Sequence, residues 1–283
     1  MVIDYPVNNF VRDEYGRPSG IAAINKPAGV TSHDLVDKIR KELGTKKVGH
    51  AGALDVFAEG VMIYLIGKAT KLSEKLMHLD KEYVTTVILG VATDTQDREG
   101  KVTEIKTGYK IKDISNIRKT LKGFVGEYMQ YVSVYSSVKV GGRKLRVLMR
   151  DDNFDKQIRF DTNAKKQLVL IPKDGNSYSQ ELIIDIPAKL ITIYELELIE
   201  KGDIQISEMG SFATKLKNIP STQTFPYIRI KVRSSKGTYI RQLAEDIGDK
   251  IAMPAMLLNL TRTKVGEISL DDCIDPDLSL IHI

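Results

Sequence analysis

The chain has 283 residues, of which 42% are hydrophobic and 28% are charged, a composition typical of a globular protein that buries its own core. Its single cysteine, Cys273, excludes an intrachain disulfide and is compatible with a reducing compartment. The longest apolar run, residues 61–66, is far shorter than the roughly 20 residues of a membrane-spanning helix, and the start MVIDYPVNNF lacks the basic region of a secretion signal, so we expect a cytoplasmic protein without a membrane partner.

The net charge is only +5, so the distribution of basic residues is more informative than their excess. Residues 139–150 and residues 228–241 each hold five basic residues and no acid. Such stretches are compatible with a solvated surface or with a phosphate-rich partner, and the sequence leaves both open. If the partner is RNA, we expect Arg229 and Lys231 to contact its phosphates.

The first half of the chain begins with a polar segment, residues 1–20, which predicts a loosely ordered N-terminal extension. A short strand and a Pro-Gly turn should follow. Thr31 and Asp34 then form a capping-box pattern ahead of leucine and isoleucine residues spaced four apart, and Gly44 comes directly after them, which predicts a helix between these signals. Residues 61–66 predict a buried strand.

Further along the chain, leucines at helical spacing predict a helix over residues 72–79, and β-branched residues predict a strand over 83–89. A second helix is expected at residues 113–122. Residues 228–233 alternate arginine or lysine with isoleucine or valine, and this period of two indicates a strand with one apolar and one cationic face. Apolar residues at helical spacing over 240–247 predict the next helix.

These elements follow no regular βαβ order, so we predict an α+β fold with a mostly antiparallel or mixed central sheet flanked by helices. We expect the main domain to span residues 21–273 and a short tail to span 274–283. Residues 151–186 are polar and show a hairpin pattern around Asp174 and Gly175. We interpret them as an accessory insertion within the domain, at whose place a short turn should suffice.

Motifs for several other kinds of chemistry fail on their residues. GVMIYLIGKAT has the wrong glycine spacing for a phosphate-binding loop, and DTQDREG has Gln96 and Arg98 where a calcium loop needs ligands. The histidines and the lone cysteine lack metal-ligand spacing, and no G-x-S-x-G motif is present. The sequence therefore predicts no metal site and no cofactor.

Four segments, in order and suitably separated, resemble the bacterial-type TruB tRNA pseudouridine synthases, which isomerise uridine at position 55 in the TΨC loop of tRNA. The similarity covers residues 24–150 and 186–270. The four segments are INKPAGVTSHDLV (24–36), KKVGHAGALDVFAEGV (46–61), KEYVTTVILGVATDTQDREG (81–100) and KGTYIRQLAEDIG (236–248).

The resemblance implies the pseudouridine synthase fold and the conversion of uridine 55 to pseudouridine with base flipping. This isomerisation involves no net redox change, so the resemblance implies no cofactor. The implied partner is the TΨC stem-loop of tRNA, bound by a monomer without a guide RNA or an obligate protein partner. The C-terminal RNA-binding domain common in the family is expected to be truncated or absent.

The resemblance also implies roles for particular residues. Asp55 matches the catalytic aspartate, an ionised nucleophile, although the motif alone leaves open whether it attacks the sugar or the base or removes a sugar proton. Arg241 matches the arginine that pairs with this aspartate. Tyr83 matches the tyrosine that stacks on the target base. Taken singly, each is equally open to an ordinary structural reading: a turn, a surface contact or a packed side chain.

Four more residues match positions near the substrate in the family. Tyr239 and Leu260 match residues that line the uridine pocket, and His50 matches the histidine associated with the flipped-out base. Lys26 is expected to bind near the substrate by buttressing the loop that carries the catalytic aspartate.

The chain also departs from the family pattern at Ala51, Ala53, Val56 and Glu59, where threonine or proline is usual. These changes affect the fit of the substrate more than the reaction, because the reacting groups are retained. Two alternatives remain open: a non-catalytic protein that binds or folds tRNA, and a pseudouridine synthase that acts on another RNA stem-loop.

Overall fold

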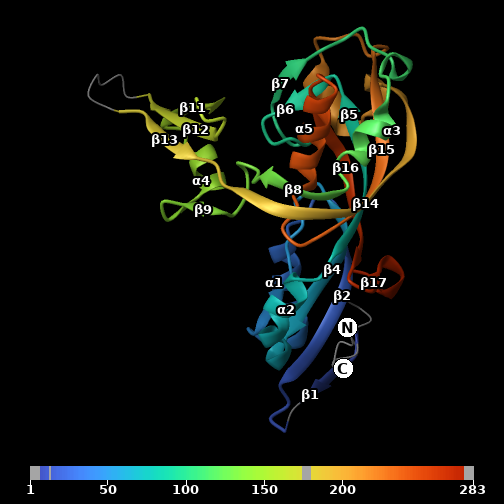
Figure 1. The fold of residues 1–283 in the computed structure, drawn as a ribbon. Helices are drawn as coiled ribbons and strands as arrows, with labels where there is room; N and C mark the ends of the chain where they lie inside the picture. Colours follow the sequence, from blue (N-terminus) through green and yellow to red (C-terminus); the bar gives the residue numbers. More distant parts are fainter. Residues whose placement is uncertain (1–6, 13, 174–179, 277–283) are drawn as a thin grey trace.

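A computed structural model describes residues 7–12, 14–173 and 180–276 (Figure 1). Its centre is a ten-stranded sheet that runs through the whole length of the molecule, in the order β1-β2-β4-β16-β5-β15-β14-β8, with β3 beside β4 and β17 beside β16. The strands are β1 (Phe10–Arg12), β2 (Pro18–Lys26), β3 (Val48–His50), β4 (Glu59–Ile66), β5 (Lys81–Leu89), β8 (Gly126–Tyr131), β14 (Ala188–Gln205), β15 (Thr224–Ser234), β16 (Ala255–Val265) and β17 (Ile268–Ser269).

Strands β4 and β16 run parallel, and the other paired strands of this sheet, within the described ranges, run antiparallel. The predicted α+β class with a mostly antiparallel sheet is therefore confirmed. Helices pack on both faces of the sheet: α1 (Ser32–Leu43), α2 (Ser73–Met77), α3 (Ile117–Lys122) and α5 (Ile240–Lys250), with α4 (Leu145–Met149) lying near the smaller strands.

Strands β2 and β4 consist almost entirely of apolar residues because both of their faces are covered. On one face, their alternate residues share an apolar cluster with Leu35 and Ile39 of α1. On the other face, the intervening residues pack with Leu76 of α2. Each fully buried leucine or isoleucine contributes about 1.5–3 kcal/mol, so this two-sided burial accounts for much of the stability of this half of the sheet.

Helix α1 begins and ends as the sequence predicts. The Thr31 hydroxyl accepts from the Asp34 amide at 3.0 Å, and the Asp34 carboxylate accepts from the Thr31 amide at 2.7 Å. Gly44 ends the helix in the left-handed conformation, with φ 62°. This reciprocal cap fixes the direction in which the chain enters α1.

Three expected elements differ in extent. The helix predicted over residues 72–79 is a 3₁₀ turn, Gly67–Leu72, followed by the five residues of α2. The helix predicted at 113–122 is the shorter α3, because Asn116, with φ 60°, breaks it from the preceding turn. The N-terminal segment is less loose than expected: β1 pairs with β2, which begins at Pro18, ahead of the boundary predicted at residue 21.

Strand β15 has the predicted two faces, and two of the three cations on its polar face pair with acids. Lys231 pairs with Glu82 at 3.1 Å and Arg233 with Glu195 at 2.9 Å, and Arg229 lies across from Glu200 on β14. These acids come from neighbouring strands, so a window along one strand could not reveal them. The ion pair of Lys231 weakens the expectation that it contacts RNA phosphates, whereas Arg229 is exposed and its expected contact stays a prediction.

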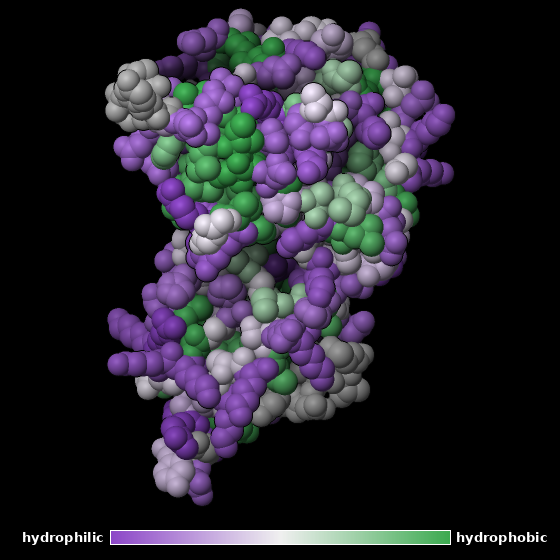
Figure 2. Space-filling view, turned by 60° about the vertical axis from the view of Figure 1, so that its left-hand side comes forward, coloured by the Kyte–Doolittle hydropathy of each residue, from purple (hydrophilic) through white to green (hydrophobic). Residues whose placement is uncertain are grey.

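The insertion forms a separate antiparallel sheet of β11 (Phe154–Phe160), β12 (Lys166–Pro172) and β13 (Leu182–Asp185). The hairpin β12–β13 confirms the predicted pattern, although its turn at residues 174 and 175 lies outside the described residues. Figure 1 shows this sheet projecting from the body beside β8 and α4. In Figure 2, where it comes forward, apolar surface is visible over it, consistent with the exposure of Ile158 and Phe160.

The insertion is not detached from the rest of the molecule. Leu168, Leu170 and Ile184 belong to the same apolar cluster as Val134 and Leu148, which lie in the segment that precedes the insertion. This shared core argues against the expectation that a short turn could replace the insertion without consequence, because such a change would expose the inner side of the cluster.

Two smaller hairpins complete the fold: β6 (Val91–Thr93) with β7 (Val102–Ile105), and β9 (Lys139–Val140) with β10 (Arg143–Lys144). In the part of the chain that the structure describes, no helix is long and apolar enough to cross a membrane.

The parallel pairing of β4 with β16 depends on Gly60. Its φ is +112°, and a Cβ built there would lie 2.2 Å from the carbonyl oxygen of Arg262. We predict that Gly60→Ala lowers the free energy of unfolding by about 2 kcal/mol or more, because backbone strain and overpacking add. Urea unfolding would measure this loss, with Gly49→Ala as the control, because nothing lies within 4 Å of a Cβ at Gly49. Equal stability of the two variants would contradict the prediction.

Candidate active site

A cavity of about 670 Å³ lies where both halves of the sheet meet. Its walls come from the start of α1, the loop between β3 and β4 (residues 51–58, here the β3–β4 loop), β5, β16, the segment 135–150 and the start of α5. The lining residues are Thr31, Ser32, His33, His50, Ala53, Leu54, Asp55, Val56, Tyr83, Tyr135, Ser136, Ser137, Arg146, Arg150, Thr238, Tyr239, Ile240, Arg241 and Leu260.

An ion pair between Asp55 and Arg241 lies at the wall of this cavity. The Arg241 Nε lies 2.9 Å from Asp55 Oδ2, and Arg241 Nη2 donates to Asp55 Oδ1 at 3.3 Å. The planar guanidinium therefore meets both oxygens of the carboxylate, a geometry that a lysine ammonium does not reproduce. The pair that the resemblance implies is thus present in the structure.

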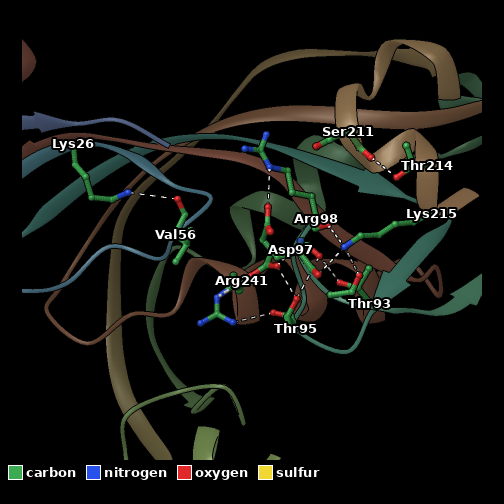
Figure 3. Close-up of polar contacts among 12 residues, drawn as sticks. Lys26, Val56, Thr93, Thr95, Asp97, Arg98, Ser211, Thr214, Lys215 and Arg241 are labelled. Atoms are coloured by element: carbon green, nitrogen blue, oxygen red, sulfur yellow. Dashed lines mark hydrogen bonds and ion pairs between the residues drawn. The ribbon is translucent and has the colours of Figure 1, made fainter. Parts of the chain in front are cut away.

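A second carboxylate, Asp97, holds the same arginine from behind. Arg241 Nε lies 3.6 Å from Asp97 Oδ2, and Arg241 Nη1 donates to the Thr95 carbonyl at 2.9 Å (Figure 3). The Arg241 side chain is 7% exposed and that of Asp97 is 5% exposed, whereas that of Asp55 is 44% exposed. The buried arginine thus joins a buried carboxylate to one that is open to the cavity.

The turn at residues 93–97 explains why Asp97 is held in place. Its Oδ1 accepts from the Thr95 hydroxyl at 2.6 Å and from the Glu99 amide at 2.9 Å, and its carbonyl accepts from the Thr93 hydroxyl at 2.6 Å. Burial raises the pKa of Asp97, while the Arg241 charge and these hydrogen bonds act to lower it. Residues 94–100, which lack the ligands of a calcium loop, therefore contain the turn that contacts Arg241.

The β3–β4 loop is fastened on both sides of Asp55. The Ser32 hydroxyl donates to the Leu54 carbonyl at 3.1 Å and accepts from the Leu54 amide at 3.0 Å. On the other side, the Gly29 amide donates to the Val56 carbonyl at 2.8 Å. The N-terminal motif thus serves to position the backbone on which Asp55 sits.

Lys26 lies behind this loop, fully buried. Its Nζ donates to the carbonyls of Pro27 and Val30 at 2.8 and 2.9 Å and reaches the Val56 carbonyl at 3.5 Å (Figure 3). Burial lowers the pKa of Lys26 to about 8. Its contacts fit the expected buttress of the loop, and the cavity is lined by other residues, so direct contact of Lys26 with a bound molecule has no geometric support.

The apolar side of the cavity consists of Tyr83, Tyr239 and Leu260, as the resemblance implies. Tyr83 and Leu260 are 9% and 6% exposed, so each contributes one face to the cavity and packs its remainder in the core. Tyr239 is held by its amide, which donates to the Gln130 side chain at 2.8 Å, and burial raises the pKa of its hydroxyl. These groups offer flat surfaces for a planar ligand.

His50 lies at the end of β3 and also lines the cavity. Burial lowers its pKa, with a smaller effect from the positive charges of His33 and Arg262, so the neutral ring is favoured. Its Nδ1 is buried and, within the described residues, has no hydrogen-bond partner. The ring thus lines the cavity while its Nδ1 is enclosed by protein.

Sequence reasoning missed several residues that the structure brings to the site. Arg146 and Arg150 are exposed and line the cavity from α4 and the residue after it; their basic stretch is recognisable, but its relation to Asp55 is not. Arg262 donates to the carbonyls of Gly52 and Val61 at 3.1 and 2.7 Å and so ties β16 to the β3–β4 loop.

Within the described part of the chain, no group of three histidine, cysteine or acidic side chains is placed to hold a metal ion. The charged and polar groups at the cavity include the carboxylate of Asp55, the guanidinium that holds it, and the tyrosine, histidine and arginine side chains around them.

The fold defines the class of protein. In a solved H/ACA RNP bound to a substrate RNA containing 2'-deoxyuridine, one chain has a similar fold. The match covers 92% of this chain, with a TM-score of 0.52 and 22% sequence identity. A Cbf5-Nop10-Gar1 complex matches 96% of this chain with a TM-score of 0.53 and 20% identity. This chain spans 52% and 59% of the matched chains. These similarities confirm the predicted pseudouridine synthase fold.

Sequence comparison gives the particular family. Residues 40–166 match the TruB family pseudouridylate synthase N-terminal domain. The chain is 33% identical over 255 residues to tRNA pseudouridine synthase B of Geobacillus thermodenitrificans, which covers 90% of this chain and 70% of the relative. It is 34% identical over 259 residues to the Bacillus subtilis protein of the same name, covering 92% and 69%. The chain belongs to the TruB family.

The two carboxylates around Arg241 should differ in their effect on stability. We predict that Asp97→Asn lowers the free energy of unfolding by about 2–4 kcal/mol, because it removes a buried charge from beside a buried arginine. Asp55→Asn should cost less than about 1 kcal/mol, because its carboxylate is half exposed. Urea unfolding of both variants measures the difference. A larger loss for Asp55→Asn would show that Asp97 is not the structural anchor of Arg241.

Proposed function

We propose that this chain isomerises uridine to pseudouridine at position 55, in the TΨC loop of tRNA, with Asp55 as the catalytic residue. The observation that carries the proposal is the Asp55 carboxylate, which is clamped by Arg241 through both oxygens and still open to a large cavity. Membership of the TruB family, whose bacterial relatives carry the name tRNA pseudouridine synthase B, supports the reaction and the substrate class.

The reaction breaks the bond between N1 of uracil and C1′ of the ribose, turns the base, and joins C5 to C1′ with loss of the C5 proton. The product has the same atoms as the substrate and no electrons are gained or lost. The step that detaches the base requires an anionic group that acts on the nucleoside. We assign this role to Asp55, whose carboxylate Arg241 orients through both oxygens.

The cavity suits a nucleotide that has left its stack. Ligand cavities typically measure about 300–1,000 Å³, and the size of this one falls within that range. Unstacking a base costs a few kcal/mol, which new contacts must offset. Tyr83 stacks on the uracil, Tyr239 and Leu260 enclose it, and His50 lies beside the entering nucleotide.

We further propose a monomer that binds tRNA directly, without a guide RNA or an obligate protein partner. A substrate of this kind places the protein in the cytoplasm. The small side chain of Ala53, in place of the usual threonine, leaves room beside Asp55 for the RNA backbone, whereas Ala51 is fully buried.

Arg146 and Arg150 are placed to bind phosphates of this RNA, because both are exposed at the cavity and lie four residues apart. We predict that Arg146→Ala and Arg150→Ala each reduce the slope of log affinity against log salt by about 0.7, the value for one phosphate of a single strand. Lys231→Ala is the matched control, since Glu82 already neutralises this cation. The measurement is the affinity for a TΨC stem-loop across a salt series. A flatter slope for Lys231→Ala than for either arginine variant would refute this assignment.

The central prediction concerns Asp55. Asp55→Asn should bind a TΨC stem-loop normally and form no pseudouridine above background, because an amide of the same size cannot act as the anionic group. Arg241→Lys should retain about a tenth to a hundredth of the rate, because the charge remains and the fork is lost. The readout is uridine conversion in a defined tRNA transcript under single-turnover conditions.

Glu59→Gln is the control for this experiment. Glu59 lies four residues after Asp55 and accepts from the Thr261 hydroxyl at 3.0 Å, away from the cavity-lining residues, so its rate should be close to that of the unmodified chain. Near-normal turnover by Asp55→Asn would overturn the assignment of the catalytic residue. Mapping pseudouridine in total RNA with and without the protein separates tRNA position 55 from another stem-loop, and binding with no pseudouridine anywhere would indicate a non-catalytic tRNA-binding protein.

A further inference from the structure

A polar network connects the insertion to the helix that carries Arg241. Lys166 of β12 lies with its Nζ 3.0 Å from Glu245 Oε2 on α5. The side chain of Lys166 is only 12% exposed and that of Glu245 is 35% exposed, so water weakens this pair less than a surface pair. Glu245 follows Arg241 by four residues, one turn further along the same helix.

The same oxygen of Glu245 is also bound by two amides. Gln96 Nε2 donates to Glu245 Oε2 at 2.8 Å, and Gln242 Nε2 donates to it at 2.7 Å. Gln96 Nε2 also lies 2.8 Å from Gln242 Oε1. Glu245 Oε2 therefore contacts three donors: the Lys166 ammonium of the insertion, the Gln242 amide of its own helix and the Gln96 amide of the turn at residues 93–97.

Gln96 occupies the position in that turn between the two residues that contact Arg241. It lies between Thr95, whose carbonyl accepts from Arg241, and Asp97, whose carboxylate lies against the same arginine. Its φ of 65° is a left-handed conformation that a glutamine adopts only when its surroundings hold it. Its side chain is 6% exposed, and its bond to Glu245 is one of the contacts that holds it.

Lys166 is also the cation beside a group of acids on α5. Asp246 and Asp249 lie near Glu245, and the charge of Glu245 raises the pKa of each, while that of Lys166 lowers it. The pKa of Asp246 is raised to about 6, chiefly by burial. Removal of Lys166 would leave these acids to repel one another next to the turn that holds Arg241.

We propose that Lys166 and Glu245 are positioning residues, which act through Gln96 and the turn at residues 93–97 to hold Arg241 in line with Asp55. The insertion thereby becomes part of the support of the catalytic pair, although none of its residues needs to touch the reacting nucleotide. This inference rests on the proposed function for its kinetic readout, and it assigns a role to Lys166, which lies outside the four segments that carry the resemblance.

The test compares Lys166→Met with Lys165→Met. Lys165 is the neighbouring residue, it pairs with Asp185 at 3.7 Å within the insertion, and both partners are more than half exposed. Both variants therefore remove one positive charge from the insertion, and only Lys166→Met breaks the link to α5. We expect Lys166→Met to lower the single-turnover rate at saturating tRNA by about tenfold, with an affinity equal to that of Lys165→Met. Lys166→Arg, which keeps the ion pair, should restore most of the rate.

Glu245→Gln should slow the reaction to a similar extent, and the double variant Lys166→Met/Glu245→Gln should be no slower than the worse single variant, because both break one link. Equal rates for Lys166→Met and Lys165→Met would overturn the proposal. So would a loss confined to tRNA affinity, which would mean that Lys166 acts as a phosphate contact.

A second measurement does not depend on activity. Hydrogen exchange of the Arg241 Nε–H proton, followed by NMR, reports how firmly the guanidinium is held between the two aspartates. We expect faster exchange in Lys166→Met than in Lys165→Met, and unchanged exchange would refute the coupling. If the unmodified chain formed no pseudouridine in any RNA, the proposed function would fail, whereas this exchange experiment would still decide whether the insertion positions Arg241.

Discussion

The arrangement of the site depends on one buried guanidinium. Arg241 lies between Asp97, which is buried, and Asp55, which is open to the cavity. A buried arginine is costly unless its charge is compensated and its donors are bonded, and here two carboxylates and the Thr95 carbonyl do so. The requirement to compensate this charge brings together the β3–β4 loop, the turn at residues 93–97 and helix α5. The Asp55 carboxylate is thereby oriented by the same contacts that stabilise the fold.

The supports of Asp55 form two layers that differ in character. The backbone of its loop is fastened by neutral hydrogen bonds from Ser32 and Gly29 and by the ammonium of Lys26, which is enclosed behind the loop. The side chain is fastened by charge, through Arg241. The first layer fixes where the carboxylate is, and the second fixes which way it points. A substitution in the loop, such as the alanine at position 53, can therefore change the shape of the cavity without moving the Asp55 carboxylate.

Sequence alone could predict the features that are local. The cap and the apolar spacing predict helix α1. The resemblance points to Asp55, Tyr83, Tyr239, Arg241 and Leu260, and all five line one cavity. What could not be predicted depends on partners distant along the chain. Lys231 and Arg233 of β15 pair with acids of β5 and β14, and Lys166 reaches Glu245 across 79 positions. Neither pairing can be predicted from the sequence of one strand, because each depends on the spatial order of the strands in the fold.

That order has a consequence for how the protein is made. Strand β16 is close to the C-terminal end of the described chain, yet it lies in the middle of the sheet, between β4 and β5. While the chain emerges from the ribosome, β4 and β5 have no partner on their facing edges until residue 265 has been synthesised. Unpaired strand edges are the surfaces on which chains associate wrongly, and long-range pairing is slow. The nascent protein therefore passes through a long interval with an open sheet. This interval ends when β16 inserts between β4 and β5, which pairs both exposed edges and brings Leu260 to the cavity.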